Sequence, residues 1–267
     1  MIGVTTLNDK IFVIFHNVPH IVVYMSQEPY TKLPNISVNG LKNPYDIAAG
    51  MICLFVSDPG SRAIWRVKLP YNIVDQWLSG VRVVTISVSS EMKLVLLVMA
   101  DSQGSIEELN ATYHCEIHVY SPRAEKETVT RLPRDFTSPH HAIMTTRKTF
   151  IVCHGYEWHE MNRVCEVDMS GHMVKAFGSA PSVAQLNEPY HVSMDDEERI
   201  IVADSRNKNV LLLNNEFVFQ HVLVTGNDPQ ALRDGVGGPF RLHNDRRSGR
   251  LLVGLENGHV DIYKFSH

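Results

Sequence analysis

The chain has 267 residues, with 25 Lys plus Arg against 29 Asp plus Glu, so its formal net charge at pH 7 is −4. Domains that mainly bind nucleic acid carry a clustered basic surface, and this balance argues against one. No membrane span is predicted, because the sequence contains no apolar run of about 18 residues. No signal peptide is predicted either, because no basic segment is followed by an apolar one at the start of the sequence. Four cysteines in a chain of this length form no disulfide framework, so we expect reduced thiols in the cytoplasm.

Short runs of β-branched and aliphatic residues, separated by polar turns, predict strands along the whole chain. No segment has the length and periodicity of a helix. A long insertion at 101–114 separates two of the strands. In chain order the expected strands include 4–7, 11–15, 21–24, 32–38, 47–49, 53–56, 64–67, 73–77, 190–194, 200–203, 210–213, 216–222, 251–253 and 260–263.

One short motif recurs at the start of predicted strands: Pro, a ring residue, then a polar residue. Its prolines are Pro44, Pro139, Pro189 and Pro239, and the first gap is about twice the other two. A period of about 45 residues with four strands per unit predicts a six-bladed β-propeller, because a single small sheet cannot bury both of its faces. We expect one all-β domain whose blades span approximately 3–40, 41–78, 79–134, 135–183, 184–234 and 235–267.

Two of these units also resemble the NHL repeat. Phe177-Gly178, Gln185-Leu186-Asn187-Glu188-Pro189 and Val202-Ala203-Asp204-Ser205-Arg206-Asn207 match its pattern, and Phe55-Val56-Ser57-Asp58 is a second good match. The other four units match loosely. The resemblance implies an NHL-type propeller of the kind found in stand-alone repeat proteins and in tripartite-motif ubiquitin ligases, where it would recognise the substrate.

The last unit leaves no room for a fourth strand before His267. Either an upstream segment outside this chain supplied that strand, or the last blade has three strands and an exposed edge. We favour the first alternative. An open edge would allow self-association, because unpaired strand edges pair with other chains.

In a propeller, the polar residue that opens each inner strand lies near one mouth of the central channel. We therefore expect Asp46, His141, His191 and Arg241 to meet there, with Tyr45, His140 and Tyr190 beside them. Such a set suits a small anion, a peptide terminus or a metal. The alternative is that these groups satisfy one another and fill the channel.

No metal or other cofactor is expected. Amidating lyases are NHL-like propellers that hold zinc with channel histidines following Pro, but the matching positions here are Tyr45, His140, Tyr190 and Phe240, of which one is His. Nucleophile-elbow, phosphate-loop and His-Glu-x-x-His motifs are absent from the sequence. Cys153 and Cys165 fall on adjacent predicted strands. We expect a buried thiol pair there, and the alternative is a redox switch.

The loops joining second and third strands should surround the same mouth. These loops carry eight acids against four bases, a net charge of 4 − 8 = −4, which should repel RNA. The opposite face is mixed: it combines Arg147, Lys148 and other arginines with the acidic turn 195–198. A protein or peptide suits the loops better, since aromatic anchors in a polar rim are typical of interfaces. The expected rim residues are Tyr156, Trp158, Arg163 and Arg206.

The sequence therefore predicts a non-catalytic recognition module that binds a protein or peptide at this mouth. The alternative is a channel-centred hydrolase or lyase acting on a small anion, with His141 and His191 as acid–base groups and Arg241 as the anion clamp. RNA binding through the opposite face is a third interpretation.

Overall fold

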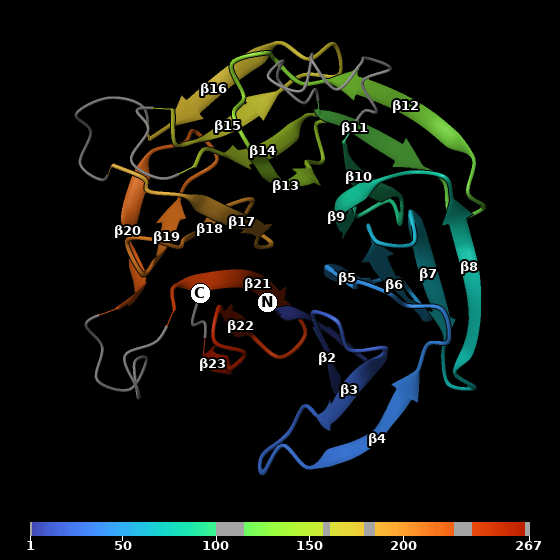
Figure 1. Ribbon diagram of the computed structural model, residues 1–267. Coiled ribbons are helices and arrows are strands. Elements are labelled where there is room, and N and C mark those ends of the chain that lie inside the picture. The colour runs from blue at the N-terminus through green and yellow to red at the C-terminus, as the bar shows by residue number, and fades with distance from the viewer. Residues whose placement is uncertain (1, 100–114, 157–160, 179–184, 227–236, 265–267) are drawn as a thin grey trace.

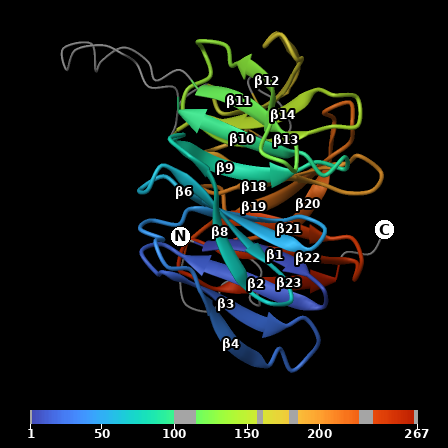
Figure 2. The ribbon, with the colours of Figure 1, turned by 90° about the vertical axis from the view of Figure 1, so that its right-hand side faces the viewer.

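The computed structural model describes residues 2–99, 115–156, 161–178, 185–226 and 237–264. These residues form six antiparallel sheets arranged around a ring, and they contain no helix, so the predicted six-bladed β-propeller is confirmed (Figure 1). The view turned by 90° shows the sheets of neighbouring blades stacked against one another (Figure 2). No helix able to cross a membrane is found in this described part of the chain.

Each sheet is a simple meander whose strands pair in chain order. The blades are numbered here in chain order. Their strands are β1 Ile2–Leu7, β2 Lys10–Phe15, β3 His20–Met25 and β4 Lys32–Ser37; β5 Asp46–Ala49, β6 Cys53–Asp58, β7 Ala63–Lys68 and β8 Ile73–Ser79; β9 Val83–Val88, β10 Leu94–Met99, β11 Cys115–Tyr120 and β12 Lys126–Arg131; β13 Pro139–Met144, β14 Phe150–His154, β15 Arg163–Val167 and β16 Met173–Phe177; β17 Pro189–Met194, β18 Ile200–Asp204, β19 Asn209–Leu213 and β20 Phe219–Thr225; β21 Pro239–Asp245, β22 Arg250–Leu255 and β23 Val260–Lys264.

The hydrophobic core is divided into six clusters, and each cluster fills the space between two neighbouring blades. Successive side chains of one strand point to opposite faces of the sheet, and this alternation produces the division. In β10, Leu94 and Leu96 pack toward blade 2, whereas Val95 and Leu97 pack toward blade 4. The middle strands therefore read as continuous apolar runs because both of their faces are buried.

The recurring Pro-ring-polar motif coincides with a break in strand register. Pro139 pairs with His154 and His141 with Cys153, so His140 has no partner on β14. The same shift occurs at Tyr190 and at Phe240. A bulge re-aims side chains. Here it lets two successive residues, the ring and the polar group, both be used at the channel.

The Asp of the NHL-like motif fastens one blade to the connector that enters it. Asp58 is fully buried, and its carboxylate accepts hydrogen bonds from the backbone N–H groups of Lys42 at 2.8 Å and Asn43 at 2.9 Å. Asp204 accepts from the N–H of Asn187 at 2.8 Å in the same way. Both carboxylates are buried and thus point inward to the connectors.

Glycine is required where the Phe-Gly pair leaves blade 4. Gly178 has φ +108°, and a Cβ there would lie 2.7 Å from the carbonyl oxygen of Asn162. Side-chain-bearing residues rarely adopt this backbone region. The pair therefore marks the turn by which the chain leaves the outer strand.

Blade 6 has three strands among the described residues, with β23 outermost. It closes the ring by packing on blade 1, where Leu252 meets Val4, Val13 and Val22. Arg250 donates a hydrogen bond to the carbonyl of Ser26 across the same junction. Closure between the described parts of blades 6 and 1 thus relies on side-chain packing.

The two neighbouring cysteines of blade 4 cannot form the redox pair considered from the sequence. Cys153 pairs with Val164, and Cys165 pairs with Val152, so the two thiols lie on opposite faces of the sheet. Cys153 belongs to the core shared with blade 5, and Cys165 to the core shared with blade 3. Burial raises the pKa of both thiols to about 12, which keeps them protonated and unreactive.

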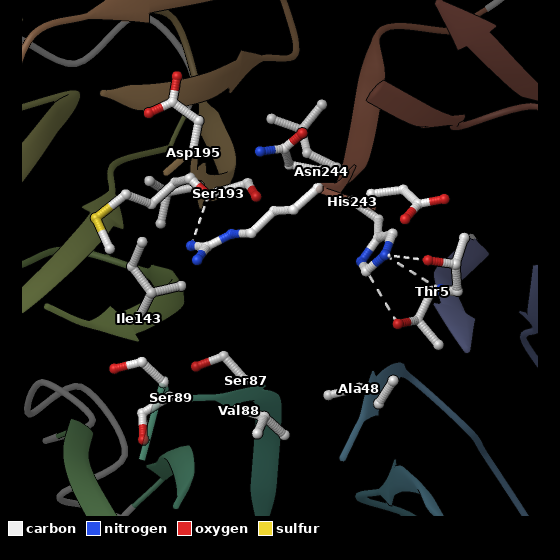
Figure 3. A pocket seen from close by; sticks show the side chains of 18 of the residues that line it. Thr5, Ala48, Ser87, Val88, Ser89, Ile143, Ser193, Asp195, His243 and Asn244 are labelled. Atoms are coloured by element: carbon white, nitrogen blue, oxygen red, sulfur yellow. Dashed lines mark hydrogen bonds between the residues drawn. The ribbon is translucent and has the colours of Figure 1, made fainter. Parts of the chain in front are cut away.

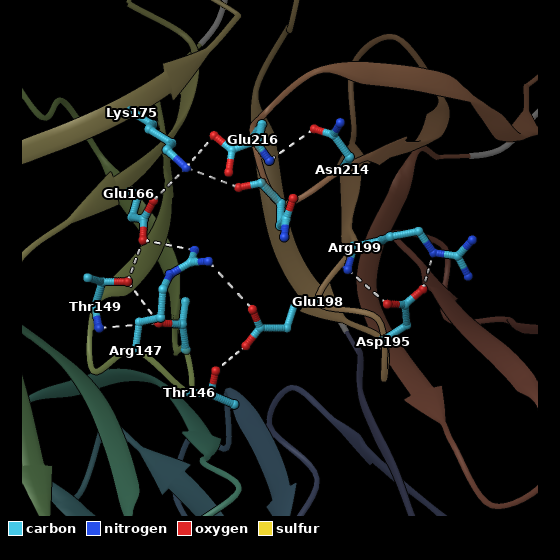
Figure 4. A network of polar contacts seen from close by, with 12 residues as sticks. Thr146, Arg147, Thr149, Glu166, Lys175, Asp195, Glu198, Arg199, Asn214 and Glu216 are labelled. Atoms are coloured by element: carbon cyan, nitrogen blue, oxygen red, sulfur yellow. Dashed lines mark hydrogen bonds and ion pairs between the residues drawn. The ribbon is translucent and has the colours of Figure 1, made fainter.

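An ion-pair network ties blades 4 and 5 at the end opposite the motif (Figure 4). Glu166 is almost fully buried and accepts from Arg147 at 3.2 Å and from Thr149 at 2.6 Å. Arg147 also pairs with Glu198 at 3.6 Å, on the other blade. A buried carboxylate needs such partners.

We expect Asp58→Ala to destabilise the fold by about 2–4 kcal/mol, because it leaves the backbone N–H groups of Lys42 and Asn43 without their acceptor. Urea unfolding followed by circular dichroism measures the loss. Asp58→Asn should cost less, since one oxygen remains. A change in Asp58→Ala below about 0.5 kcal/mol would contradict the fastening role.

Candidate functional site

The channel has two different ends. The inner strands β1, β5, β9, β13, β17 and β21 begin at what we call the amino mouth and end at the carboxyl mouth. Strand register places the loops between second and third strands at the amino mouth, because Pro139 pairs with His154 and Pro189 with Asp204. The sequence-predicted residues that the structure describes lie toward the amino mouth.

Aromatic rings fill the channel at the amino mouth. Tyr190 stacks on His140 with ring centroids 4.2 Å apart and contacts the Phe240 ring at 3.8 Å. The hydroxyls of Tyr45 and Tyr190 hydrogen-bond at 3.0 Å. These rings come from blades 2, 4, 5 and 6, so together they form a layer across the channel.

Directly beside this layer lie the four polar residues expected to meet at the channel. They do meet, but they are buried: Asp46 is 2% exposed, His141 2%, His191 7% and Arg241 1%. The Nε of Arg241 lies 3.3 Å from Oδ1 of Asp46, and its guanidinium carbon lies 4.6 Å from the Phe240 ring centroid. A guanidinium held by a carboxylate and enclosed by rings cannot clamp an anion arriving at the mouth, so the structure contradicts that expected role of Arg241.

These polar side chains bond the inner strands to one another around the channel. Asp46 accepts from the N–H of Ile86 at 3.0 Å, joining blades 2 and 3, and Ser87 donates to the carbonyl of Ala142 at 2.8 Å, joining blades 3 and 4. Arg241 donates to the carbonyl of Tyr45 at 3.2 Å. The alternative weighed from the sequence, that the groups satisfy one another, describes much of this set.

Histidines continue the ring through the remaining blades. His141 stacks on His191 with ring centroids 3.6 Å apart, and Nδ1 of His191 accepts from the N–H of Leu242 at 3.4 Å. Nε2 of His243 accepts from the N–H of Thr6 at 3.2 Å, across the junction of blades 6 and 1. An accepting nitrogen carries no proton, so His191 is protonated on Nε2 and His243 on Nδ1.

Burial keeps these imidazoles neutral. It lowers the pKa of His141 to about 3, with the charge of Arg241 adding to the effect, and it lowers the pKa of His243 to about 4. The pKa of His191 also lies well below its usual value, because burial and then His141 disfavour its charged form. Weak bases of this kind are poor general bases near pH 7.

A cavity of about 600 Å³ occupies the other half of the channel and ends at His141 and His191. It reaches the carboxyl mouth, at the turns that follow the inner strands. Figure 3 shows Ser87, Ser193 and Asn244 around it, and His243 hydrogen-bonded to Thr5. Its polar lining consists of Thr5, Thr6, Ser87, Ser89, Ser90, His141, Thr146, His191, Ser193, Asp195, Asp196, Glu198, His243, Asn244, Asp245, Arg246 and Arg247.

The charged groups of the cavity stand at its rim and are paired. Its lining contains four acids and two arginines, which gives 2 − 4 = −2. Asp195 pairs with Arg199 at 2.6 Å and Asp196 with Arg246 at 3.1 Å. Glu198 pairs with Arg147 at 3.6 Å and Asp245 with Arg250 at 3.8 Å, so each of the four acids has an arginine partner.

Two polar atoms of residues in the lining are buried and unpaired within the described part of the chain. Nδ1 of His141 and Nδ2 of Asn244 make no hydrogen bond with any described residue. Buried polar atoms are nearly always hydrogen-bonded, so these two atoms are exceptions.

Asp46, His141 and His191 also have the composition of a metal site, since their donor atoms lie within 4.8 Å of one another. The geometry does not fit an ion. The two imidazoles stack with an interplanar angle of 21°, so their lone pairs run side by side instead of converging. Nδ1 of His191 accepts the hydrogen bond from Leu242, so Nε2 carries the proton and has no lone pair for a metal ion. In a metal-binding histidine one nitrogen binds the metal and the other donates a hydrogen bond.

The expected rim residues that the structure describes differ in their exposure and contacts. Tyr156 is 45% exposed; Arg206 pairs with Glu188 at 2.7 Å, and Arg163 donates to the sulfur of Met161 at 3.2 Å. Trp158 lies outside the described residues. The rim has therefore one exposed aromatic anchor in the described part of the chain.

The cavity lining was missed in the sequence, although a signal for it exists. Residues two positions beyond each buried polar residue point the same way along a strand. Applied to Asp46, His141, His191 and Arg241, this rule leads to Ala48, Ile143, Ser193 and His243, all of which line the cavity.

Comparison with known proteins supports the fold. No family model matches the sequence, and no curated protein matches it. Among solved structures, a protein of unknown function from Bacteroides caccae aligns with a TM-score of 0.67 and 11% identity over 92% of this chain and 82% of that one. The gluconolactonase XC5397 of Xanthomonas campestris aligns with a TM-score of 0.66 and 11% identity, over 95% and 81%. Virginiamycin B lyase of Staphylococcus aureus aligns at 0.61 and 11%, over 100% and 84%. At this identity the likeness shows the propeller fold alone.

Acid should destabilise the protein through its buried histidines. Their pKa values are lower in the folded state than in the unfolded chain, so as the pH falls below about 6.5 the unfolded chain binds protons first. Stability is thus complete above that pH and is lost toward pH 4. In His191→Asn the amide oxygen can still accept from Leu242, and the slope of the unfolding free energy against pH should fall by up to about 1.4 kcal/mol per pH unit. Urea unfolding from pH 4 to 7 measures it; unchanged slopes would contradict the neutral, buried state of His191.

Proposed function

We propose that this protein binds a small, uncharged polar molecule in the channel cavity, entering through the carboxyl mouth. The observation that carries the proposal is the cavity itself: about 600 Å³, lined by hydroxyls and neutral imidazoles. Ligand sites are typically concave, of about 300–1,000 Å³, with a few placed polar groups. The hydroxyls of lining residues such as Thr5, Ser87 and Ser193 supply such groups.

Charge argues for an uncharged ligand. Anions would find arginines engaged, since Arg246 is held by Asp196 and Arg250 by Asp245. Cations would find the acids of the rim engaged, since Asp195 is held by Arg199 and Asp196 by Arg246. A hydroxyl both donates and accepts, and so does the lining of serines, threonines, Asn244 and His243.

Hydrolase or lyase chemistry in the same cavity is the second candidate. It is favoured by the enzymes among proteins of this fold, which is an argument from analogy. The acid–base groups would be His141 and His191, the histidines at the inner end of the cavity. Their lowered pKa values make them weak bases, and for this reason we place binding first.

The finer predictions from the sequence also stay as proposals. The NHL-type assignment is supported by the equivalent roles of Asp58 and Asp204 in their connectors. Docking of a protein or peptide at the amino mouth is supported by the exposed Tyr156. RNA binding at the opposite face finds little support, since Arg147, Arg246 and Arg250 are paired with acids there.

Filling the cavity should abolish ligand binding. Ser193 lines the cavity and is half-buried, so Ser193→Phe places a ring in it, whereas Ser193→Ala leaves it open. We expect uncharged polyols, sugars and amides to give saturation-transfer NMR signals with the wild type and Ser193→Ala, and to bind Ser193→Phe at least about tenfold more weakly.

Thermal unfolding checks that both variants fold. A compound set in which only carboxylates or phosphates bind would contradict the proposal, as would binding that Ser193→Phe leaves unchanged. Release of protons from added sugar lactones, lost in His191→Asn, would favour the second candidate.

A further inference from the structure

A second cavity adjoins the first. It measures about 590 Å³ and lies at the junction of blades 6 and 1, beside the carboxyl mouth. The two cavities have four lining residues in common: Thr6, Leu7, Asp245 and Arg247. A shared boundary of this kind makes one continuous groove from the channel across the junction.

We infer that the second cavity is a further subsite, and that the ligand is an uncharged polyhydroxy chain of at least two units, as in an oligosaccharide. One unit occupies the channel cavity and the next lies over the junction of blades 6 and 1. The inference rests on the proposed function, which assigns the channel cavity to an uncharged polar ligand.

The lining of the second cavity is charge-balanced. It contains Asp9 and Asp245 against Arg247 and Arg250, 2 − 2 = 0, together with Asn8, Gln27, Ser26 and Ser248. The lining thus offers both donors and acceptors, which suits hydroxyls that donate and accept at once. A single anion or cation would meet an unfavourable charge on one side.

The two arginines have different roles. Arg250 is 17% exposed and is held by Ser248 at 2.8 Å, by Asp245 at 3.8 Å and by the Ser26 carbonyl, so it braces the wall. Arg247 is 75% exposed, and its contact with Asp9 is long, at 3.7 Å. Such a loose exposed pair contributes little to stability, so its donors and acceptors are available to hydroxyls.

The test compares a panel of neutral mono-, di- and trisaccharides by saturation-transfer NMR and isothermal calorimetry. For the wild type we expect the matching disaccharide to bind about tenfold or more tightly than its monosaccharide. Gln27 is exposed and lines the second cavity alone, so Gln27→Trp fills that cavity without touching the channel. It should remove the advantage of the disaccharide and leave monosaccharide binding unchanged.

Gln220→Trp is the matched control, because Gln220 is exposed on β20, away from both cavities. Equal affinities for one and two units, or a disaccharide advantage that survives Gln27→Trp, would overturn the subsite and leave the channel site standing. If no saccharide of the panel binds while other uncharged compounds do, the polyhydroxy assignment fails. If no uncharged compound binds, the proposed function fails with it.

Discussion

The bonds between inner strands around the channel are the constraint on which the rest of the structure depends. Six sheets meet at an axis where their inner edges carry backbone groups and side chains with little access to water. Asp46, Ser87, His191 and His243 each bond to a neighbouring blade there. Because an unpaired buried polar group is costly, each bond both joins two blades and meets a requirement of burial. The apolar clusters between blades then supply the bulk of the packing.

This constraint also decides which half of the channel can hold a ligand. At the amino mouth Tyr45, Tyr190 and Phe240 lie over the guanidinium of Arg241, and Asp46 neutralises its charge. That half is filled by protein. Beyond His141 and His191 the lining changes to smaller residues such as Ser87 and Ser193, and space remains. The same burial that keeps the histidines neutral gives the cavity an uncharged inner end, which is why its chemistry suits hydroxyls better than anions.

The candidate site could be predicted in part. The motif of proline, ring and polar residue identified the layer of Asp46, His141, His191 and Arg241, and these residues do meet. The motif did not predict that these residues are buried. Ring stacking between residues of different blades depends on the register shifts at His140, Tyr190 and Phe240, and the motif marks the positions of these shifts without showing which rings then meet.

By itself the sequence determined the propeller, because a repeated unit of short strands is a local pattern, and units with two apolar faces can be buried only by stacking around a ring. It also determined the motif positions, including Asp58 and Asp204, whose partners lie in the adjoining connector. Only the tertiary structure decided where the space lies. The cavity and its neighbour are assembled from separate inner strands and turns, such as those at Thr6, Ser193 and Arg247. Their shape depends on how far the blades approach one another, which is set by packing over the whole ring.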